Sequence, residues 1–289
     1  MSEGTVHPLA KPVGRTHAAG VFDWHAVPST DPRASAFALD TAPALPAAAE
    51  EFSGEACREI VEDLLDRTRT GAAVAEVHAP FCESKCDGCG CWQHAYKELE
   101  SRRWADALVR EMAAWADTHA QAGAPIQALR FGGGTPSALE PVDILHVLAK
   151  AHQYLPLSND CSIELQARVH GFSEEKIEAA LAGGVTRFVL PVRSFSTEVR
   201  QAAGRLDAGE AAEKLLKRLT EYNESAVAVE LNFGLPGQSL EVWTADLERA
   251  CQLPLDGLII RAAGEPDILG EAAKTFRAAD PALMARMHE

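Results

Sequence analysis

Short apolar runs alternate with longer amphipathic stretches from residue 72 onward, and this alternation limits the folds open to the 289-residue chain. Strands separated by helices pair in parallel through right-handed crossovers. We expect strands at 73–78, 127–131, 162–166, 187–192, 226–233 and 257–261, and helices at 99–119, 140–153, 173–183, 208–222 and 239–252. The pattern predicts an α/β fold, a partial (β/α)6 barrel of parallel strands whose functional loops follow the C-terminal strand ends.

The segments that flank this alternation differ from it in composition. The first 53 residues are rich in Ala, Pro and small polar residues without a sustained period, which predicts an irregular N-terminal extension. A first helix is expected over 54–68, with Ile60, Leu64 and Leu65 on one face. We therefore divide the chain into an extension over 1–53, a partial-barrel core over 54–266 and a short C-terminal tail over 267–289.

Charge and cysteine usage exclude several classes of protein. The formal net charge of −15, from 27 basic and 42 acidic residues, argues against non-specific binding to nucleic acid or to an anionic membrane. No apolar stretch is long enough to cross a membrane, and the N-terminus does not resemble a secretory signal. Four of the seven cysteines lie within ten residues, which indicates a metal site in a reducing compartment, so we expect a cytoplasmic protein. The others, Cys57, Cys161 and Cys251, are expected in the core.

Cys82, Cys86 and Cys89 have the spacing C-x-x-x-C-x-x-C on one short loop. Three thiolates can hold three irons of a 4Fe–4S cluster and leave the fourth iron open to a small molecule. The cysteine spacing resembles that of enzymes whose open iron binds S-adenosylmethionine through its amino and carboxylate groups, so we expect this molecule as the ligand. A zinc site is the alternative, although structural zinc usually takes four ligands in two separated pairs. Cys91 is a candidate fourth ligand, but its C-x-C spacing favours a thiol near the substrate and makes it the one candidate catalytic side chain.

Two further features lie in or directly after predicted strands. Phe131-Gly-Gly-Gly-Thr-Pro-Ser137 comes directly after the second strand, and consecutive glycines let a ligand approach the backbone closely. This run is a candidate seat for the amino group of S-adenosylmethionine; Thr135 and Ser137 are alternatively caps of the next helix. Glu164 lies in the third strand, where a carboxylate among apolar neighbours needs a partner. We favour a ligand ammonium over a nearby Arg.

Taken in order, these motifs resemble the radical S-adenosylmethionine (radical SAM) superfamily. The similarity covers residues 72–265 and consists of H-x-P-F-C-x-x-x-C-x-x-C, G-G-G-T-P, a strand Glu, G-V-x-R-F and G-L-P-G-Q. The closer similarity is to the branch with oxygen-independent coproporphyrinogen III oxidase, a haem chaperone and the haem-degrading methyltransferase anaerobilin synthase. Residues 124–139 and the pair Arg168-Val169 look most like the haem-degrading member, whereas Cys91 looks like a feature of the oxidase.

The resemblance implies roles for individual residues. The three cysteines would ligate the cluster, Gly133 and Glu164 would contact a first S-adenosylmethionine, and Gly88 and Ala262 would flank it. A second S-adenosylmethionine site would include the matching residues Gly134, Thr135 and Arg205, together with Arg193 and Glu230, which replace the family's Gln and Asp. Other departures from the family pattern are Glu76 for Tyr, Pro191 for Gly and Arg261 for Tyr, and they gather on the second-cofactor and substrate side.

The resemblance also implies a function. A reduced cluster would cleave S-adenosylmethionine to a 5′-deoxyadenosyl radical, and the substrate would be a tetrapyrrole, either haem or a porphyrinogen. A flavodoxin- or ferredoxin-type protein would donate the electron. Arg193, Arg205 and Arg261 could pair with propionates, with ordinary salt bridges as the alternative. The competing hypothesis is a haem-binding or haem-trafficking accessory protein that keeps the cluster without radical chemistry.

Overall fold

A six-stranded parallel sheet forms the centre of the computed structural model, which describes residues 54–84, 86, 94–263 and 280–288. Its strands are β1 (Ala73–Ala79), β4 (Ile126–Gly133), β5 (Leu157–Gln166), β6 (Arg187–Arg193), β7 (Ala226–Phe233) and β8 (Gly257–Ala262). Each of these six strands pairs in parallel with the next of the six, in the order β1-β4-β5-β6-β7-β8. The α/β fold and the open barrel of six parallel strands are confirmed.

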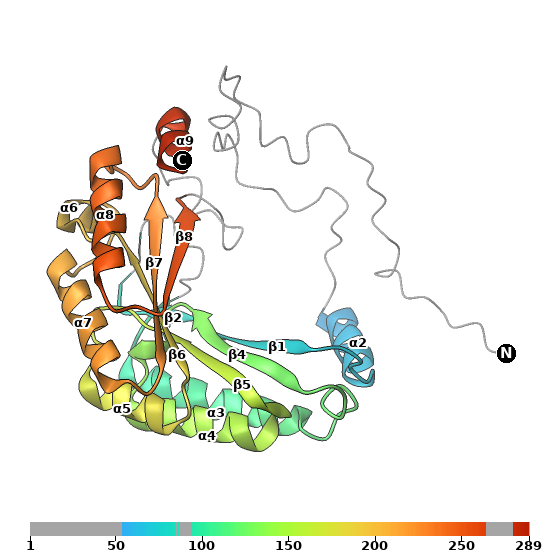
Figure 1. The fold of residues 1–289 in the computed structure, drawn as a ribbon. Coiled ribbons are helices and arrows are strands. Elements are labelled where there is room, and N and C mark those ends of the chain that lie inside the picture. The colour runs from blue at the N-terminus through green and yellow to red at the C-terminus, as the bar shows by residue number, and fades with distance from the viewer. Residues whose placement is uncertain (1–53, 85, 87–93, 264–279, 289) are drawn as a thin grey trace, which may run out of the picture.

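Helices cover one face of the curved sheet (Figure 1). They are α3 (Glu98–Trp115), α4 (Pro141–Tyr154), α5 (Glu174–Ala182), α7 (Gly209–Tyr222) and α8 (Leu240–Gln252). The short elements are α6 (Thr197–Ala202), the 3-10 turn η2 (Pro136–Ala138) and the two-residue strands β2 (Phe81–Cys82) and β3 (His94–Ala95). At the ends of the described chain lie α2 (Gly54–Leu65) and α9 (Pro281–His288).

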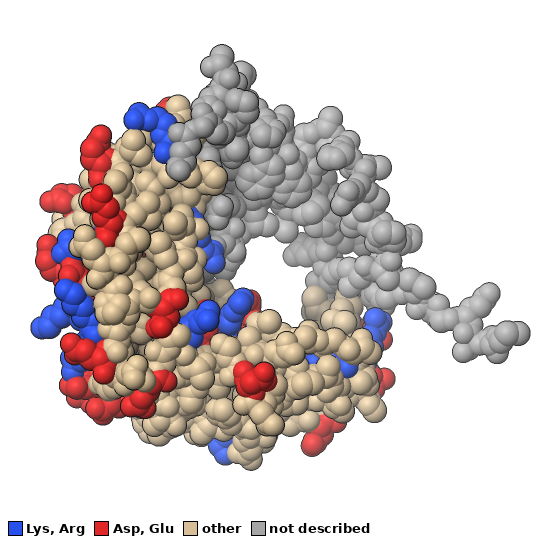
Figure 2. All heavy atoms as spheres, in the orientation of Figure 1, with Lys and Arg blue, Asp and Glu red and all other residues tan. Residues whose placement is uncertain are grey.

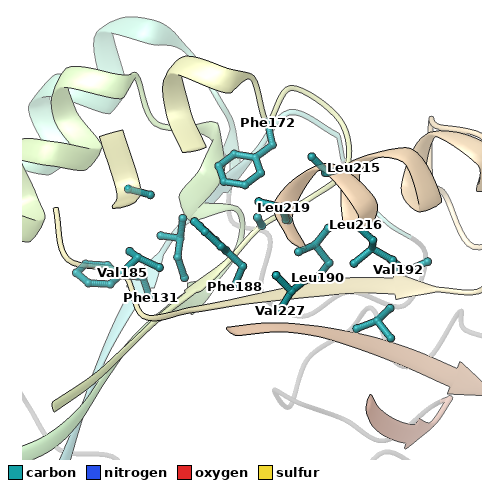
Figure 3. Packing of buried hydrophobic residues seen from close by; sticks show 14 of the residues in the cluster. Phe131, Phe172, Val185, Phe188, Leu190, Val192, Leu215, Leu216, Leu219 and Val227 are labelled. Carbon is teal, nitrogen blue, oxygen red and sulfur yellow. The ribbon is translucent and has the colours of Figure 1, made fainter. Parts of the chain in front are cut away.

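The hydrophobic core lies between the sheet and the helices (Figure 3). Phe188, Leu190 and Val192 alternate along β6 and point toward this layer, as the period of two in a strand requires. Leu216 and Leu219 of α7 meet them with helical spacing. Each such fully buried side chain contributes about 1.5–3 kcal/mol relative to its exposed state, which fixes α7 on β6 and β7.

On the other face of the sheet, alternate side chains of β1 are exposed to solvent. Exposure alternates along this strand, with Val74, Glu76 and His78 exposed on the face turned away from the helices. Lys and Arg side chains gather along the hollowed inner side in Figure 2, whereas many acidic side chains lie on the outer helices. The inner side of the sheet is therefore the side on which basic side chains face the solvent.

Several sequence expectations need correction. Helix α2 ends at Leu65 and α3 at Trp115, earlier than expected, while β5 begins at Leu157 and α6 and α9 were not expected. Cys57 and Cys251 are exposed and Cys161 is half-buried, so the core placement was wrong for the first two. Cys57 lies on α2, which has no buried residue, and Cys251 lies on the outer side of α8 near its end. Within the described residues, no helix combines the length and hydropathy that a membrane crossing needs.

Candidate functional site

The sequence motifs come together at the C-terminal ends of β1, β4 and β5. Strand β1 pairs with β4 so that Ala79 lies opposite Gly133, and the cysteine loop starts at β2 immediately after β1. Arg168 follows the end of β5 by two residues. The topology therefore places the cysteine loop, the glycine run and the segment after Glu164 side by side at one edge of the sheet.

Two of the three proposed cluster ligands lie in the described chain, and both are buried. Cys82 is 5% exposed and its Sγ accepts a hydrogen bond from Thr135 Oγ1 at 3.1 Å. Cys86 is 6% exposed and its Sγ accepts one from Arg168 Nη2 at 3.3 Å. Donors aimed at buried sulfurs stabilise their negatively charged form, so the pair fits a thiolate-bound iron–sulfur cluster.

Cys89, Cys91 and Gly88 lie outside the described residues. Because the third proposed ligand is among them, the described part of the chain contains no group of three potential metal-ligating side chains. The role of Cys91, as a fourth ligand or as a thiol near the substrate, stays a prediction.

The glycine run is required by the packing of the chain itself. Gly133 has φ +87°, and a Cβ built there would lie 1.5 Å from His78 Cδ2. Gly134 donates its N–H to Ala79 O at 2.7 Å, and a Cβ on it would lie 2.4 Å from Phe81 O. No side chain fits at either position, so these glycines hold β4 directly against the start of the cysteine loop.

Thr135 and Ser137 do not act as the helix caps that we considered. Thr135 occupies the N-cap position of η2, but its hydroxyl bonds to Cys82 rather than to a backbone N–H of the turn. Ser137 Oγ accepts the backbone N–H of Arg168 at 3.0 Å. Lys176 donates to Ser137 O and to a neighbouring carbonyl, and burial lowers its pKa. Both hydroxyls therefore tie the glycine segment to other parts of the site.

Four arginines surround this edge of the sheet. They are Arg168, Arg193, Arg200 and Arg205. Burial lowers the pKa of Arg205 to about 9, the negative charge of Cys86 raises it, and the other three arginines lower it further. A guanidinium with such a pKa is still charged at neutral pH, so Arg205 keeps a buried positive charge that suits an anionic ligand.

Three buried polar atoms near this arginine group lack a partner within the described chain. They are the Nε atoms of Arg193 and Arg205 and the Oδ1 atom of Asn232. Buried polar groups in proteins are nearly always hydrogen-bonded. The orphaned atoms lie on β6, on β7 and after α6, where the resemblance implies the second S-adenosylmethionine, and they fit a polar ligand.

Arg200 differs from Arg193 and Arg205, whose Nε atoms lack partners within the described chain. It is 1% exposed, forms an ion pair with Asp207 and donates to Asp207 O at 2.9 Å and to Ser194 O at 3.2 Å. It also donates to the carbonyl of Val192. With its donors used within the chain, Arg200 is a structural link between the end of β6 and the segment after α6.

Arg193 ends β6 in a conformation that favours glycine. Its φ is +72°, and the pairing of β6 with β7 shifts register between Pro191 and Arg193. Buried Asp246 holds the next residues, since it accepts from Ser194 Oγ and from Phe195 N, each at 2.7 Å. A residue other than glycine that is held at positive φ stores backbone strain, and such strained residues are concentrated at functional sites.

The G-L-P-G-Q motif builds a turn. Gln238 Oε1 accepts from Leu235 N, and Gln238 Nε2 donates to Asn232 O, both at 3.1 Å. The same Nε2 lies 3.4 Å from Asp246 Oδ2. The glutamine therefore closes the turn after β7 and joins it to the carboxylate that holds the end of β6.

The remaining residues proposed to contact S-adenosylmethionine are Glu164, Glu230 and Ala262, which lie on β5, β7 and β8. Glu164 is half-buried in β5, opposite Arg130 of β4 and Arg187 of β6, and makes no ion pair with any described residue. Glu230 pairs with Arg261 at 3.5 Å, which matches the salt-bridge alternative for Arg261. Ala262 is buried at the end of β8, opposite Phe233. Their contacts with S-adenosylmethionine stay predictions.

Sequence reasoning missed some residues that shape the site. Arg168 was noted only as part of a resemblance, and the contributions of Asn232, Arg200, Asp207 and Asp246 were not expected. Arg168 had a usable signal, because a cation two residues beyond a buried strand falls at the functional edge of a parallel sheet. The others depend on contacts between distant segments that no local pattern encodes.

Comparisons with known proteins agree with this geometry. Residues 77–250 match the model of the radical SAM superfamily. Anaerobilin synthase of Escherichia coli O157:H7 is 36% identical over 212 residues, 73% of this chain and 48% of that protein. The haem chaperone HemW of E. coli K12 is 29% identical over 178 residues, 61% of this chain and 47% of that protein.

A solved structure shares the fold. The structure of coproporphyrinogen III oxidase (HemN) from E. coli aligns with a TM-score of 0.68 at 23% identity, over 82% of this chain and 54% of that one. The chain spans about half the length of the curated relatives that it matches.

Proposed function

The chain belongs to the radical SAM superfamily, and from that premise we propose that Cys82, Cys86 and Cys89 hold a 4Fe–4S cluster whose open iron binds S-adenosylmethionine. The observation that carries this proposal is the pair of buried sulfurs at the sheet edge. Each accepts a hydrogen bond from a different motif, Thr135 of the glycine segment and Arg168 after β5.

The bound cluster would supply one electron that cleaves S-adenosylmethionine to methionine and a 5′-deoxyadenosyl radical. The chain's own residues bind and orient this cofactor. Gly133 and Gly134 let the end of β4 pack directly against His78 and the start of the cysteine loop, and Gly88, Gly133 and Ala262 would border the cofactor in the proposal. Glu164, which has no ion pair within the described chain, would accept hydrogen bonds from the cofactor ammonium.

We assign the second, cationic part of the edge to a second S-adenosylmethionine or to substrate carboxylates. Arg193 and Arg205 present buried Nε donors that lack partners within the described chain, and a guanidinium matches a carboxylate in bidentate geometry. Gly134 and Thr135, which follow the end of β4, and Glu230 of β7 complete this second site in the proposal. Propionate groups of a tetrapyrrole carry the required charge.

The substrate class that we propose is a tetrapyrrole, haem or a porphyrinogen. Relatives named for haem and porphyrin chemistry, anaerobilin synthase and HemW among them, support it together with the arginine group. The proposed reaction lies in anaerobic haem degradation or porphyrin metabolism, with a flavodoxin- or ferredoxin-type donor and without nucleic acid or membrane partners. The proposed compartment is the cytoplasm.

Product formation tests this proposal. Protein with a cluster reconstituted under anaerobic conditions should yield 5′-deoxyadenosine when dithionite and S-adenosylmethionine are added, and haem should increase the yield. A parallel titration of haem, followed by its absorption band with and without reductant, reports binding separately. Product whose yield is increased neither by haem nor by a porphyrinogen would contradict the tetrapyrrole assignment.

A haem-binding accessory protein is the second candidate. The similarity to HemW and the replacements on the second-cofactor side favour it, since Arg261 already pairs with Glu230 and Arg193 occupies a strained position. This candidate predicts haem binding and a fully loaded cluster, but no 5′-deoxyadenosine.

A further inference from the structure

We propose that Arg168 is a positioning residue that fixes Cys86 for the cluster and raises the cluster's reduction potential, an inference that rests on the cluster assignment of the proposed function. Its guanidinium spans two groups of the cysteine loop. Nη1 donates to Ser84 O at 2.9 Å, and Nη2 reaches Ser84 Oγ and Cys86 Sγ, both at 3.3 Å.

Arg168 is itself held rigidly. It is 8% exposed, and Ser137 Oγ accepts its backbone N–H. Ser137 is in turn bound through its carbonyl by Lys176 of α5. Arg168 therefore connects the cysteine loop to η2 and to the end of β5, the strand that carries Glu164. A side chain anchored at both ends keeps its donors directed at the sulfur without further ordering.

Burial gives this contact its electrostatic weight. A cation beside a sulfur ligand stabilises the cluster more as the cluster becomes more negative, because Coulomb attraction grows with charge and is weakly screened away from water. Reduction adds one negative charge. Hydrogen bonds to cluster sulfurs and net charge are also the factors that set iron–sulfur potentials. Arg168 supplies both at Cys86, whereas Thr135 supplies only a neutral donor at Cys82.

The test compares three variants in the full chain after anaerobic reconstitution. Arg168→Met removes the positive charge and the hydrogen-bond donors. Arg168→Lys keeps the charge but loses the planar pair of Nη donors that reaches both Ser84 and Cys86. Lys176→Met removes another buried cation, bound to the same turn at Ser137 but without a hydrogen bond to a cysteine. Iron and sulfide content and the reduction midpoint, followed by electron paramagnetic resonance, are measured together with the melting temperature of each cluster-free chain.

We expect Arg168→Met to lower the equilibrium constant for cluster reduction at least tenfold, which for one electron is a midpoint more negative by about 59 mV. Arg168→Lys should recover part of this shift, and Lys176→Met should leave the midpoint near the wild-type value. If Arg168→Met loads poorly while its cluster-free chain melts normally, restored loading in Arg168→Lys supports the positioning role.

Three results would overturn the inference. Arg168→Met could load fully at the wild-type midpoint, Lys176→Met could shift the midpoint as much as Arg168→Met, or poor loading of Arg168→Met could persist unchanged in Arg168→Lys. A wild-type chain that takes up no cluster would overturn the proposed function as well, so the two failures are distinguishable.

Discussion

The C-terminal edge of the sheet has two halves that differ in how their polar groups are satisfied. In the first half, at the ends of β1, β4 and β5, Thr135 and Arg168 bond to the cysteine sulfurs. In the second half, at the ends of β6, β7 and β8, buried atoms of Arg193, Arg205 and Asn232 have no partner within the described chain. In the first half the chain itself supplies donors to the two described cysteine sulfurs, whereas the second half is suited to a ligand that supplies the missing partners.

This difference follows the similarity to the family. The cysteine and glycine motifs match it fully, and the two cysteines in the described chain accept hydrogen bonds from Thr135 and Arg168. The replacements at Arg193, Glu230 and Arg261 lie on the second half. This division agrees with the proposed cluster chemistry in the first half and with a proposed role in substrate choice for the second half.

The largest expected effect is in the first half. Cys86→Ala should abolish the brown colour and the bound iron, because it removes one of three ligands and the sulfur that Arg168 holds. Cys251→Ala is the matched control, since Cys251 is exposed on α8. Iron analysis and the visible spectrum measure both. Equal loss in the two variants would contradict the ligand assignment.

A pair of arginines tests the second half. Arg200→Met should lower the free energy of unfolding by about 3–5 kcal/mol, because Asp207 is left without its ion-pair partner. Arg205→Met should leave it unchanged or raise it by about 1–3 kcal/mol, since it removes a buried charge without a hydrogen bond within the described chain. The same variant should lose 5′-deoxyadenosine formation if Arg205 binds the cofactor or substrate.

Denaturant unfolding of the cluster-free chains measures the two energies. Destabilisation of the Arg205 variant by as much as the Arg200 variant would show that Arg205 is satisfied by the protein, and the contrast between the two halves would disappear.

Alanine substitutions at two glycines with positive φ distinguish the cost of backbone strain from the cost of a steric clash, because only one of the two positions is crowded. Gly133→Ala should cost about 2–5 kcal/mol, because its Cβ would overlap His78 in addition to the unfavourable φ of +87°. Gly237→Ala, at φ +74° with nothing within 4 Å of the new Cβ, should cost only about 1–2 kcal/mol. Thermal unfolding gives the difference. Similar costs would mean that His78 moves aside and that the first half is less tightly built than we describe.

Asp246 makes stability depend on pH in the second half. Burial raises its pKa above 3.8, despite hydrogen bonds from Ser194 and Phe195 that lower it. The folded chain then holds the proton more tightly than the unfolded chain, so this group's contribution to stability is lost as pH rises from about 4 through the raised pKa.

Asp246→Asn tests this sign. The substitution should lower the free energy of unfolding by about 1–3 kcal/mol, because one carboxylate oxygen that accepts a buried hydrogen bond is replaced by an NH2 group, which can only donate. Its cost should also shrink as the pH rises, because the variant cannot ionise. Unfolding of both proteins between pH 4 and 7 measures the difference, and a cost that grows with pH would refute the assigned direction.

The smallest effect is expected at Arg261. Its ion pair with Glu230 is partly exposed at 3.5 Å, and such pairs contribute about 0–1 kcal/mol. Arg261→Met should therefore leave the melting temperature nearly unchanged, while haem binding reports any contact with propionates. Loss of haem binding in this variant would assign Arg261 to the substrate side after all.

The sequence predicts the sheet well because each strand combines a buried run with flanking turns. The expected ranges for β6 and β7 differ from the observed bounds by at most one residue. Strand β5 was expected to start at 162 but begins at Leu157, and the polar residues 158–160, two of them exposed, hid its first half from an apolar pattern. Helix α6 has only six residues, too few for a period to be recognised.

The sequence motifs locate part of the candidate site, whereas the tertiary contacts around it were not predictable. Cysteine spacing and the glycine run named Cys82, Cys86 and Gly133 directly. The burial of Arg205 and the bond from Arg168 to Cys86 join segments far apart in the chain, and no periodicity reports them. Exposed Cys57 and Cys251 show the converse, because an apolar residue on a helix does not reveal which face the fold buries.

Iron content and the cluster's response to S-adenosylmethionine test the central claim most directly. We predict about four irons per chain after anaerobic reconstitution and a reduced-cluster resonance spectrum that changes when S-adenosylmethionine is added. Zinc in place of iron, or an iron–sulfur cluster whose spectrum is indifferent to S-adenosylmethionine, would contradict it.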